Sequence, residues 1–144
     1  MQDARKRFKE RWHRIDILYN RFAKQSGLNF TAILVLESLE EPGVNYTQKA
    51  LCEKLALPKQ YINGIISTFW EKGYVELKEA KDRRNKTIHL TEKGEAYSKA
   101  ISKPLEDAED AAWAAFTDEE MVVFTNALEK YERKLAEALS LSAV

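Results

Sequence analysis

The stretch PKQYINGIISTFWEKG, residues 58–73, decides the expected fold. At about 100° per residue, a helix here gathers four apolar residues on one face, Ile62, Ile65, Ile66 and Phe69. The opposite face gathers four uncharged residues, Gln60, Asn63, Gly64 and Ser67. Because Lys and Glu normally cover an exposed helix face, this uncharged face predicts a surface that enters a groove and contacts base edges. A solvated surface helix fits the same pattern.

Gly64 lies in the middle of this helix, where glycine costs roughly 1 kcal/mol relative to alanine. On the polar face, a missing side chain allows the backbone to come close to a duplex or a ligand. The alternative is a glycine that the helix simply tolerates.

Composition bounds the class of protein. A chain of 144 residues with 44% hydrophobic content is expected to form one domain, or one domain with an oligomerisation element. No run approaches about 18 apolar residues, and the basic first 25 residues lack the apolar core of a signal peptide, so we expect a cytoplasmic protein without a membrane partner. The single cysteine, Cys52, lies between leucines and is interpreted as a core residue rather than a redox sensor.

The net charge of zero conceals a segregated distribution. Residues 1–24 carry 8 basic and 3 acidic side chains, whereas residues 104–144 carry 3 basic and 10 acidic ones. Residues 58–93 are basic again, with 8 cations and 5 anions. A local basic surface with an acidic tail is compatible with nucleic-acid binding, and it allows the oppositely charged ends to pack together.

Helices are expected on the N-terminal side of the central stretch. Residues 5–24 contain neither Pro nor Gly and carry apolar residues at steps mostly of three and four, Phe8, Trp12, Ile15, Leu18, Tyr19 and Phe22. Asn29 is expected to cap a buried helix, residues 30–39, and Thr47 a short helix, residues 48–55. A three-residue turn then leads to Pro58 at the first helical position, which predicts a helix-turn-helix.

A hairpin is expected on the C-terminal side. Gly73 ends the helix, and residues 74–79 alternate Val75 and Leu77 with charged residues, the period of a half-buried strand. Its partner is residues 87–90, in which His89 is expected to face solvent. The basic connection between them predicts a wing beside the central helix.

Two further helices complete the chain. Thr91 is expected to cap a long helix that Pro104 kinks or interrupts. Residues 117–120 form a capping box, and the helix after them carries an apolar seam, Met121, Phe124, Leu128, Tyr131, Leu135 and Leu139. The helices at both ends of the chain thus carry more apolar surface than one small domain can cover, which predicts a homodimer. The alternative is that the seam packs into the core of a monomer.

Three segments resemble the MarR family of winged helix-turn-helix transcriptional regulators: DRRNKTIHLTEKG (82–94), TQKALCEKLAL (47–57) and EKGYVE (71–76). The resemblance implies a mainly α fold with a small β-hairpin (α+β) in a single chain, residues 1–144. The winged helix-turn-helix would span residues 30–100. Residues 1–26 and 101–144 would form a helical dimerisation region.

The resemblance also implies sites. The DNA-binding candidates are Lys59, Gln60, Tyr61, Asn63, Gly64, Ser67, Lys81, Asp82, Arg83, Arg84 and Lys86. Within the wing, Arg84 would reach into the minor groove and Asp82 would hold the tip. The candidates for an effector pocket are Trp12, Tyr19 and Phe30, each of which also fits an ordinary core position. The dimerisation candidates are Phe8, Trp12, Phe124, Leu128, Tyr131 and Leu135.

The expected function is that of a homodimeric regulator, a repressor, which binds an inverted repeat in double-stranded DNA and responds to a small-molecule effector. No phosphate-binding loop, zinc motif or nucleophile with its base is visible, so we expect neither an enzyme nor a cofactor. A metal-sensing regulator remains an alternative, although His13, Cys52 and His89 are at least 37 residues apart. A winged-helix module that binds proteins instead of DNA is the second alternative.

Overall fold

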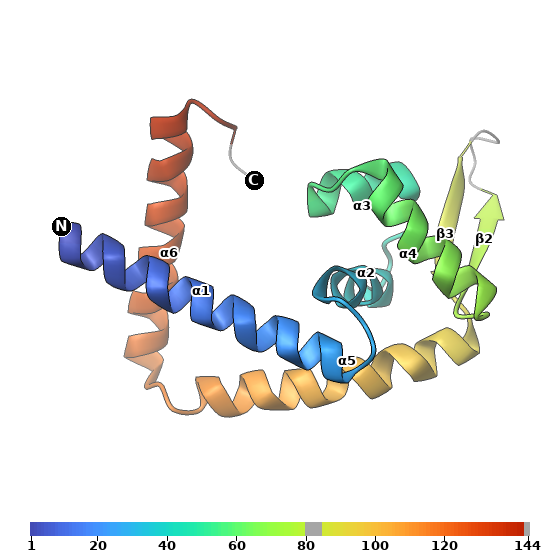
Figure 1. Cartoon of the computed structure of the whole chain (residues 1–144), viewed down its shortest axis with the longest axis horizontal. Coiled ribbons are helices and arrows are strands. Elements are labelled where there is room, and N and C mark those ends of the chain that lie inside the picture. Colours follow the sequence, from blue (N-terminus) through green and yellow to red (C-terminus); the bar gives the residue numbers. More distant parts are fainter. Residues whose placement is uncertain (80–84, 143–144) are drawn as a thin grey trace. The chain divides into compact units, whose positions relative to one another are not determined.

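The chain is mainly helical with one small antiparallel sheet, as the sequence predicted (Figure 1). The structure, a computed structural model, describes residues 1–79 and 85–142. The described helices are α1 (Gln2–Gln25), α2 (Phe30–Glu40), α3 (Gln48–Leu55), α4 (Lys59–Glu71), α5 (Glu92–Trp113) and α6 (Asp118–Leu139). The described strands are β1 (Tyr46–Thr47), β2 (Val75–Glu79) and β3 (Lys86–Leu90). The chain divides into two compact units, Met1–Leu105 and Glu106–Val144.

The core of the first unit includes most of α2. Four of its apolar residues are at most 5% exposed, Ala32, Ile33, Val35 and Leu36. The helix is apolar nearly all round, so it is covered on most sides, as expected. Helix α4 buries Ile62, Ile66 and Phe69 in the same core, while Ile65 is half-buried. This packing determines which face of α4 points outward.

The ends of the helices in this unit follow the predicted capping. The Asn29 side chain accepts a hydrogen bond from the Ala32 amide at 2.8 Å, and the Thr47 hydroxyl accepts one from the Ala50 amide at 3.1 Å. Pro58 lies one residue earlier than predicted, because it precedes the first helical residue of α4. Its missing N–H costs nothing at that position either, since the first amides of a helix have no partner within it.

The sheet has the strand order β1-β3-β2, with both pairings antiparallel. Strand β1 was not predicted, because two residues are too few for an alternating pattern. The expected burial of Leu77 is wrong: Val75 is 3% exposed but Leu77 is 45% exposed. Val75 lies at the root of the hairpin and joins the core, whereas Leu77 lies further along an edge strand and lines a surface groove. His89 is half-buried, with Nε2 2.7 Å from the Thr87 hydroxyl.

A polar cluster ties the end of α2 to β1 and α3. The Tyr46 hydroxyl donates to Oε2 of Glu41 at 2.8 Å, and the Lys54 ammonium bonds the other oxygen of the same carboxylate. The hydrogen bond from Lys54 and then that from Tyr46 lower the pKa of Glu41, and the bond to Glu41 raises the pKa of Lys54. Polar contacts of Glu41 with Tyr46 and Lys54 therefore hold the start of the helix-turn-helix in place, in addition to the apolar core.

Helix α5 runs without a break from Glu92 to Trp113, so the expected interruption at Pro104 does not occur. Proline removes one amide from the helix ladder and crowds the preceding turn. Ile101, Ser102 and Leu105 are buried around it, and this packing holds the helix together on both sides of the proline.

The second unit contains the end of α5 and the whole of α6. The capping box is confirmed, because the Thr117 hydroxyl accepts from the Glu120 amide and the Glu120 carboxylate accepts from the Thr117 amide. No described residue of α6 is buried. Its apolar seam therefore lies on the surface of this chain.

Candidate nucleic-acid interface

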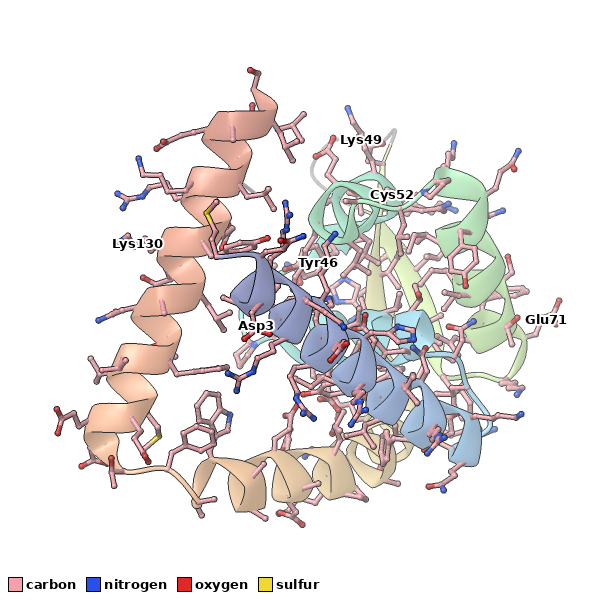
Figure 2. The ribbon with its side chains drawn as sticks, turned by 60° about the vertical axis from the view of Figure 1, so that its left-hand side comes forward. Asp3, Tyr46, Lys49, Cys52, Glu71 and Lys130 are labelled. Atoms are coloured by element: carbon pink, nitrogen blue, oxygen red, sulfur yellow. The ribbon has the colours of Figure 1, made fainter. Side chains whose placement is uncertain are left out.

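The outward face of α4 carries all six residues predicted there to bind DNA. Each of them is exposed: Lys59, Gln60, Tyr61, Asn63, Gly64 and Ser67. The core positions lie on the opposite side of the same helix, as the periodicity required. The charged residue Glu71 lies at the far end of α4 and points away from the protein (Figure 2).

Space around Gly64 is open on the solvent side. A Cβ added to this residue would meet no atom within 4 Å. Packing inside the chain therefore does not require glycine at this position. The predicted role of Gly64, close approach of the helix backbone to a duplex or a ligand, stays a prediction.

The turn between α3 and α4 sets how the two helices cross. Ala56 adopts a left-handed conformation with φ of 52°, and the Leu57 amide donates to the Cys52 carbonyl at 3.1 Å. Leu51 on α3 and Ile62 on α4 are both fully buried in the same core. The helix-turn-helix predicted from the sequence is thus present, and α4 is its second, outward-facing helix.

A groove of about 570 Å³ runs between α4, the start of α3 and the hairpin. Its cationic walls come from all three elements, through Lys49, Lys59 and Lys86. Amide side chains of Gln48, Asn63 and Asn85 line it as well, and Nε2 of Gln48 is buried with no partner in the described structure. Trp70 and Leu77 supply exposed apolar surface. Such a groove offers positive charge, hydrogen-bond donors and apolar contact to an anionic partner.

Sequence patterns did not single out most of this groove. Lys49 and Cys52 lie on α3 (Figure 2), Trp70 near the end of α4, and Leu77 on β2. Only the tertiary arrangement brings these positions together, so no spacing along the chain could have revealed them. Asn63, predicted from helical spacing, and Lys59, predicted from the family resemblance, both line this groove.

The wing is described in part. Strand β2 pairs with β3 from Val75↔Leu90 to Glu79↔Lys86, and Lys86 is exposed where β3 begins. Four of the predicted wing residues lie outside the described residues: Lys81, Asp82, Arg83 and Arg84. Figure 1 shows the hairpin beside α4, and α4 packs against β2. The two strands of the predicted hairpin therefore lie next to the central helix, and the position of its basic tip stays a prediction.

The effector candidates divide into a pair and a separate residue. The rings of Tyr19 and Phe30 pack together with centroids 4.9 Å apart, and both side chains are half-buried against the core. Trp12 is 55% exposed and packs instead against Phe8, at 5.7 Å. Tyr19 and Phe30 therefore pack against the core, and each side chain remains partly exposed to solvent.

The dimerisation candidates lie on exposed stripes. On α1, the candidate Trp12 is exposed and the candidate Phe8 is half-buried, while Ile15 and Leu18 are exposed as well. On α6, Phe124, Tyr131 and Leu135 are exposed and Leu128 is half-buried. Sequence analysis missed two aromatic residues of the second unit, Trp113 and Phe116, whose rings pack against each other and against Phe124 at centroid distances of 5.4–6.0 Å. Each unit therefore presents apolar surface that its own residues do not cover.

Other classes of site are tested only within residues 1–79 and 85–142. That part of the chain holds no cluster of three or more His, Cys, Asp or Glu side chains that could hold a metal ion. The same part contains no helix both long enough and apolar enough to cross a membrane.

Several solved structures similar to this chain are MarR family regulators. One from Neisseria meningitidis is 28% identical, with 94% of this chain and 95% of that one covered and a TM-score of 0.77. One from Methanosarcina mazei Go1 is 25% identical, with 94% and 98% covered and a TM-score of 0.67. The S. aureus MepR–DNA complex is 18% identical, with 89% and 94% covered and a TM-score of 0.72, and shows likeness of fold. No protein-family model and no curated protein matches the sequence. The predicted resemblance to MarR family transcriptional regulators, which are not enzymes, is confirmed.

Proposed function

We propose, from the likeness to MarR family regulators, that this chain is a homodimeric, sequence-specific DNA-binding transcriptional regulator. One observation carries the proposal: α4 turns an uncharged, hydrogen-bonding face to solvent, beside a hairpin and a groove lined by lysines. A DNA complex among the proteins of similar fold supports it. We propose further that the protein is a repressor whose affinity for DNA changes when a small molecule binds.

The chemistry of the α4 face suits base edges in a major groove. Gln60 and Asn63 can each form two hydrogen bonds with adenine, and Ser67 can bond to any base. Around them, Lys49, Lys59 and Lys86 can neutralise phosphates of the strand that passes between α4 and the hairpin. From the resemblance, Arg84 enters the adjacent minor groove and Asp82 supports it. The face thus separates contacts that specify a sequence from contacts that position the duplex.

The proposed dimer uses the exposed apolar stripes of α1 and α6. Six of the candidates are Phe8, Trp12, Phe124, Leu128, Tyr131 and Leu135, and we add Trp113 and Phe116. Burial of these side chains between two copies would remove them from water, and the basic α1 and the acidic C-terminal residues give the interface opposite charges. A two-fold dimer presents two α4 helices to one duplex.

Selection of duplexes from a random DNA pool tests this proposal. We expect the enriched sites to contain an inverted repeat with half-site centres about 10 base pairs apart, because two symmetry-related helices enter successive major grooves. A pool that yields a single asymmetric half-site would contradict the dimer, and a pool without enrichment would contradict sequence-specific binding.

A protein-binding winged helix is the rival function, and exposed Trp70 and Leu77 favour it locally. Salt separates the two. Contacts to phosphates release counterions, so the logarithm of the DNA affinity should fall steeply and linearly with the logarithm of salt concentration. A shallow slope with equal affinity for all duplexes would favour the rival.

The effector part of the proposal rests on Tyr19 and Phe30, whose rings pack between α1 and α2, with Trp12 further along α1. Replacement of Phe30 by Leu should leave DNA affinity nearly intact and abolish release by an effector identified through a ligand screen. Release that persists in the variant would move the effector site elsewhere.

A further inference from the structure

The C-terminal end of α4 is held by residues at the start of α5. Within the turn after α4, the Tyr74 amide donates to the Phe69 carbonyl at 2.8 Å and the Gly73 amide to the Trp70 carbonyl at 3.0 Å. Two further carbonyls at this end bind side chains that come from beyond the hairpin. The Thr91 hydroxyl donates to the Gly73 carbonyl at 2.6 Å, and the Lys93 ammonium donates to the Lys72 carbonyl at 2.9 Å.

The root of the hairpin is fixed by the same segment. The Thr91 amide donates to the Tyr74 carbonyl at 3.0 Å. Gly94 lies directly against that carbonyl, because an added Cβ would come within 1.8 Å of the Tyr74 oxygen. The Gly94 amide in turn donates to the Thr91 hydroxyl at 3.0 Å, so Thr91, directly before α5, binds both the first turn of α5 and the end of α4.

Stacked rings complete the contact. The rings of Tyr74 and Tyr97 are nearly parallel, 6° apart in orientation, with centroids 4.0 Å apart. The Lys93 ammonium lies 5.2 Å from the centre of the Tyr74 ring, so Tyr74 contacts both a cation and a second ring. Phe69, on the buried face of α4, meets both tyrosines edge to face at 6.3 and 6.4 Å. One set of contacts therefore joins α4, β2 and α5.

We propose that Lys93 and Tyr97 are positioning residues for DNA recognition, which set the orientation of α4 relative to the hairpin without touching DNA. We call Thr91, Lys93, Gly94 and Tyr97 the α5 clamp. The inference rests on the proposed DNA-binding function. Both DNA-contacting elements meet at the Lys72–Tyr74 turn, and the α5 clamp binds a carbonyl of every residue in that turn.

Base contacts and phosphate contacts depend differently on this orientation. A bidentate contact to a base edge requires side chains in fixed positions, whereas charge neutralisation by lysines tolerates displacement. Loosening of the α5 clamp should therefore lower the affinity for the selected site more than the affinity for random DNA. Burial and then the neighbouring Tyr74 raise the pKa of Tyr97 above its ordinary value of 10, and the phenol is uncharged at neutral pH at either value.

The test compares Tyr97→Leu with Tyr97→Phe in the full chain. Leucine removes the stack on Tyr74, and we expect affinity for a selected duplex to fall about tenfold while affinity for a random duplex of equal length falls less than about twofold. Phenylalanine retains the ring and should restore the ratio of the two affinities. Lys93→Met, which keeps the chain length but loses the ammonium, should lower the ratio in the same direction.

Tyr46→Leu is the matched control. Tyr46 is also half-buried, its hydroxyl is bonded, and Lys54 lies 5.1 Å from its ring centre, but it belongs to β1 and its partners are Glu41, Lys54 and Ile88 instead of residues of the turn after α4. A general loss of stability should affect both leucine variants alike. If Tyr46→Leu lowers the affinity ratio as much as Tyr97→Leu does, the positioning role is overturned.

Hydrogen exchange separates this inference from the DNA-binding proposal. In the absence of DNA, Tyr97→Leu should speed exchange of the amides of residues 72–74 by at least about tenfold relative to those of α2. If the wild-type protein shows no preference for any duplex, the proposed function is wrong. Hydrogen exchange at residues 72–74 then still tests whether the α5 clamp holds the turn after α4. Unchanged exchange at residues 72–74 would overturn the inference whatever the DNA result.

Discussion

In the first unit, α4 buries Ile62, Ile66 and Phe69, whereas in the second unit α6 buries none of its described residues. Both helices carry apolar residues at helical spacing, so the sequence pattern alone makes them alike. Every buried apolar residue among those described falls between Ala23 and Leu105. Helical spacing therefore shows that each helix has an apolar face. It does not show whether the same chain or a second copy covers that face.

Polar contacts differ between the two units in the same way. In the first unit, contacts between distant segments close the fold, such as the Lys93 ammonium on the Lys72 carbonyl. In the second unit, the Thr117 capping box, the Thr125 hydroxyl bonded to the Met121 carbonyl and the Lys134–Glu137 pair each join residues three or four positions apart. Local bonds support a helix without specifying where it packs. We expect the first unit to depend on its own interior and α6 to depend on a second copy.

The largest effect is expected from replacement of Leu128 and Leu135 by Asp. Two charges in the centre of the α6 seam would have to be buried without partners in the dimer, so the double variant should be monomeric or unfolded. Light scattering and circular dichroism report the two outcomes separately. Asn126→Asp with Arg133→Gln is the control, because it changes net charge equally on the opposite side of the helix. A folded dimeric Leu128/Leu135 variant would remove this seam from the interface.

A smaller but still large effect is expected from Gly94→Ala. The new Cβ would overlap the Tyr74 carbonyl, so α5 or β2 must shift, at a cost of about 3 kcal/mol of unfolding free energy. Gly64→Ala is the control, since its Cβ meets no atom and alanine favours a helix by roughly 1 kcal/mol. Urea denaturation should thus move the two variants in opposite directions. Equal changes would mean that the close contact at Gly94 is relaxed in solution.

The sequence predicted local features well because neighbouring residues determine them. The caps by Asn29 and Thr47 depend on residues three positions away, and the two faces of α4 depend on helical spacing. Features that join distant segments were not predicted. Strand β1 is defined only by its pairing with Ile88 and Thr87, and Leu77 is exposed because it lies on an edge strand beside a surface groove.

The candidate site shows the same division between local and distant information. The exposure of Gln60, Asn63 and Ser67 followed from spacing within one helix. The groove beside them and the stack of Tyr97 on Tyr74 could not be predicted, because each depends on elements separated by more than twenty residues. The segment 82–94 carries part of the family resemblance, and the structure gives its last residues a physical reason in the hydrogen bonds of Thr91 and Lys93 and the close approach of Gly94.

A moderate and specific effect is expected from Asn63→Ala. If Asn63 contacts a base edge, its loss should remove about 1–3 kcal/mol of discrimination at one position in each half-site and leave affinity for random DNA nearly unchanged. Thr68→Ala is the control on the same helix, because the Thr68 hydroxyl already bonds the Gly64 carbonyl at 3.0 Å. Binding assays with single-base variants of a selected duplex measure the difference. An equal loss on specific and random duplexes would make Asn63 a phosphate or scaffold contact.

The smallest effect is expected from Glu41→Gln, and it depends on pH. The pKa of Glu41 is lowered in the folded chain by the hydrogen bond from Lys54 and then by that from Tyr46, so the ionised carboxylate favours folding. For a group with a lowered pKa, this contribution is present above the ordinary value of 4.5 and is lost as pH falls through the lowered value. The wild type should therefore be more stable than the variant at about pH 7, and the difference should shrink as pH falls below 4.5.

A carboxylate of the second unit provides the control for Glu41→Gln. Glu137→Gln in α6 removes a surface pair with Lys134 at 2.7 Å, three residues away on the same helix, where such pairs contribute only about 0.2–0.5 kcal/mol. Glu41 instead joins segments thirteen residues apart, because it binds Lys54 as well as Tyr46. Thermal unfolding across the pH range should show the shrinking difference for Glu41→Gln alone. A pH-independent difference between wild type and Glu41→Gln would mean that the amide disturbs packing and that the charge itself contributes nothing.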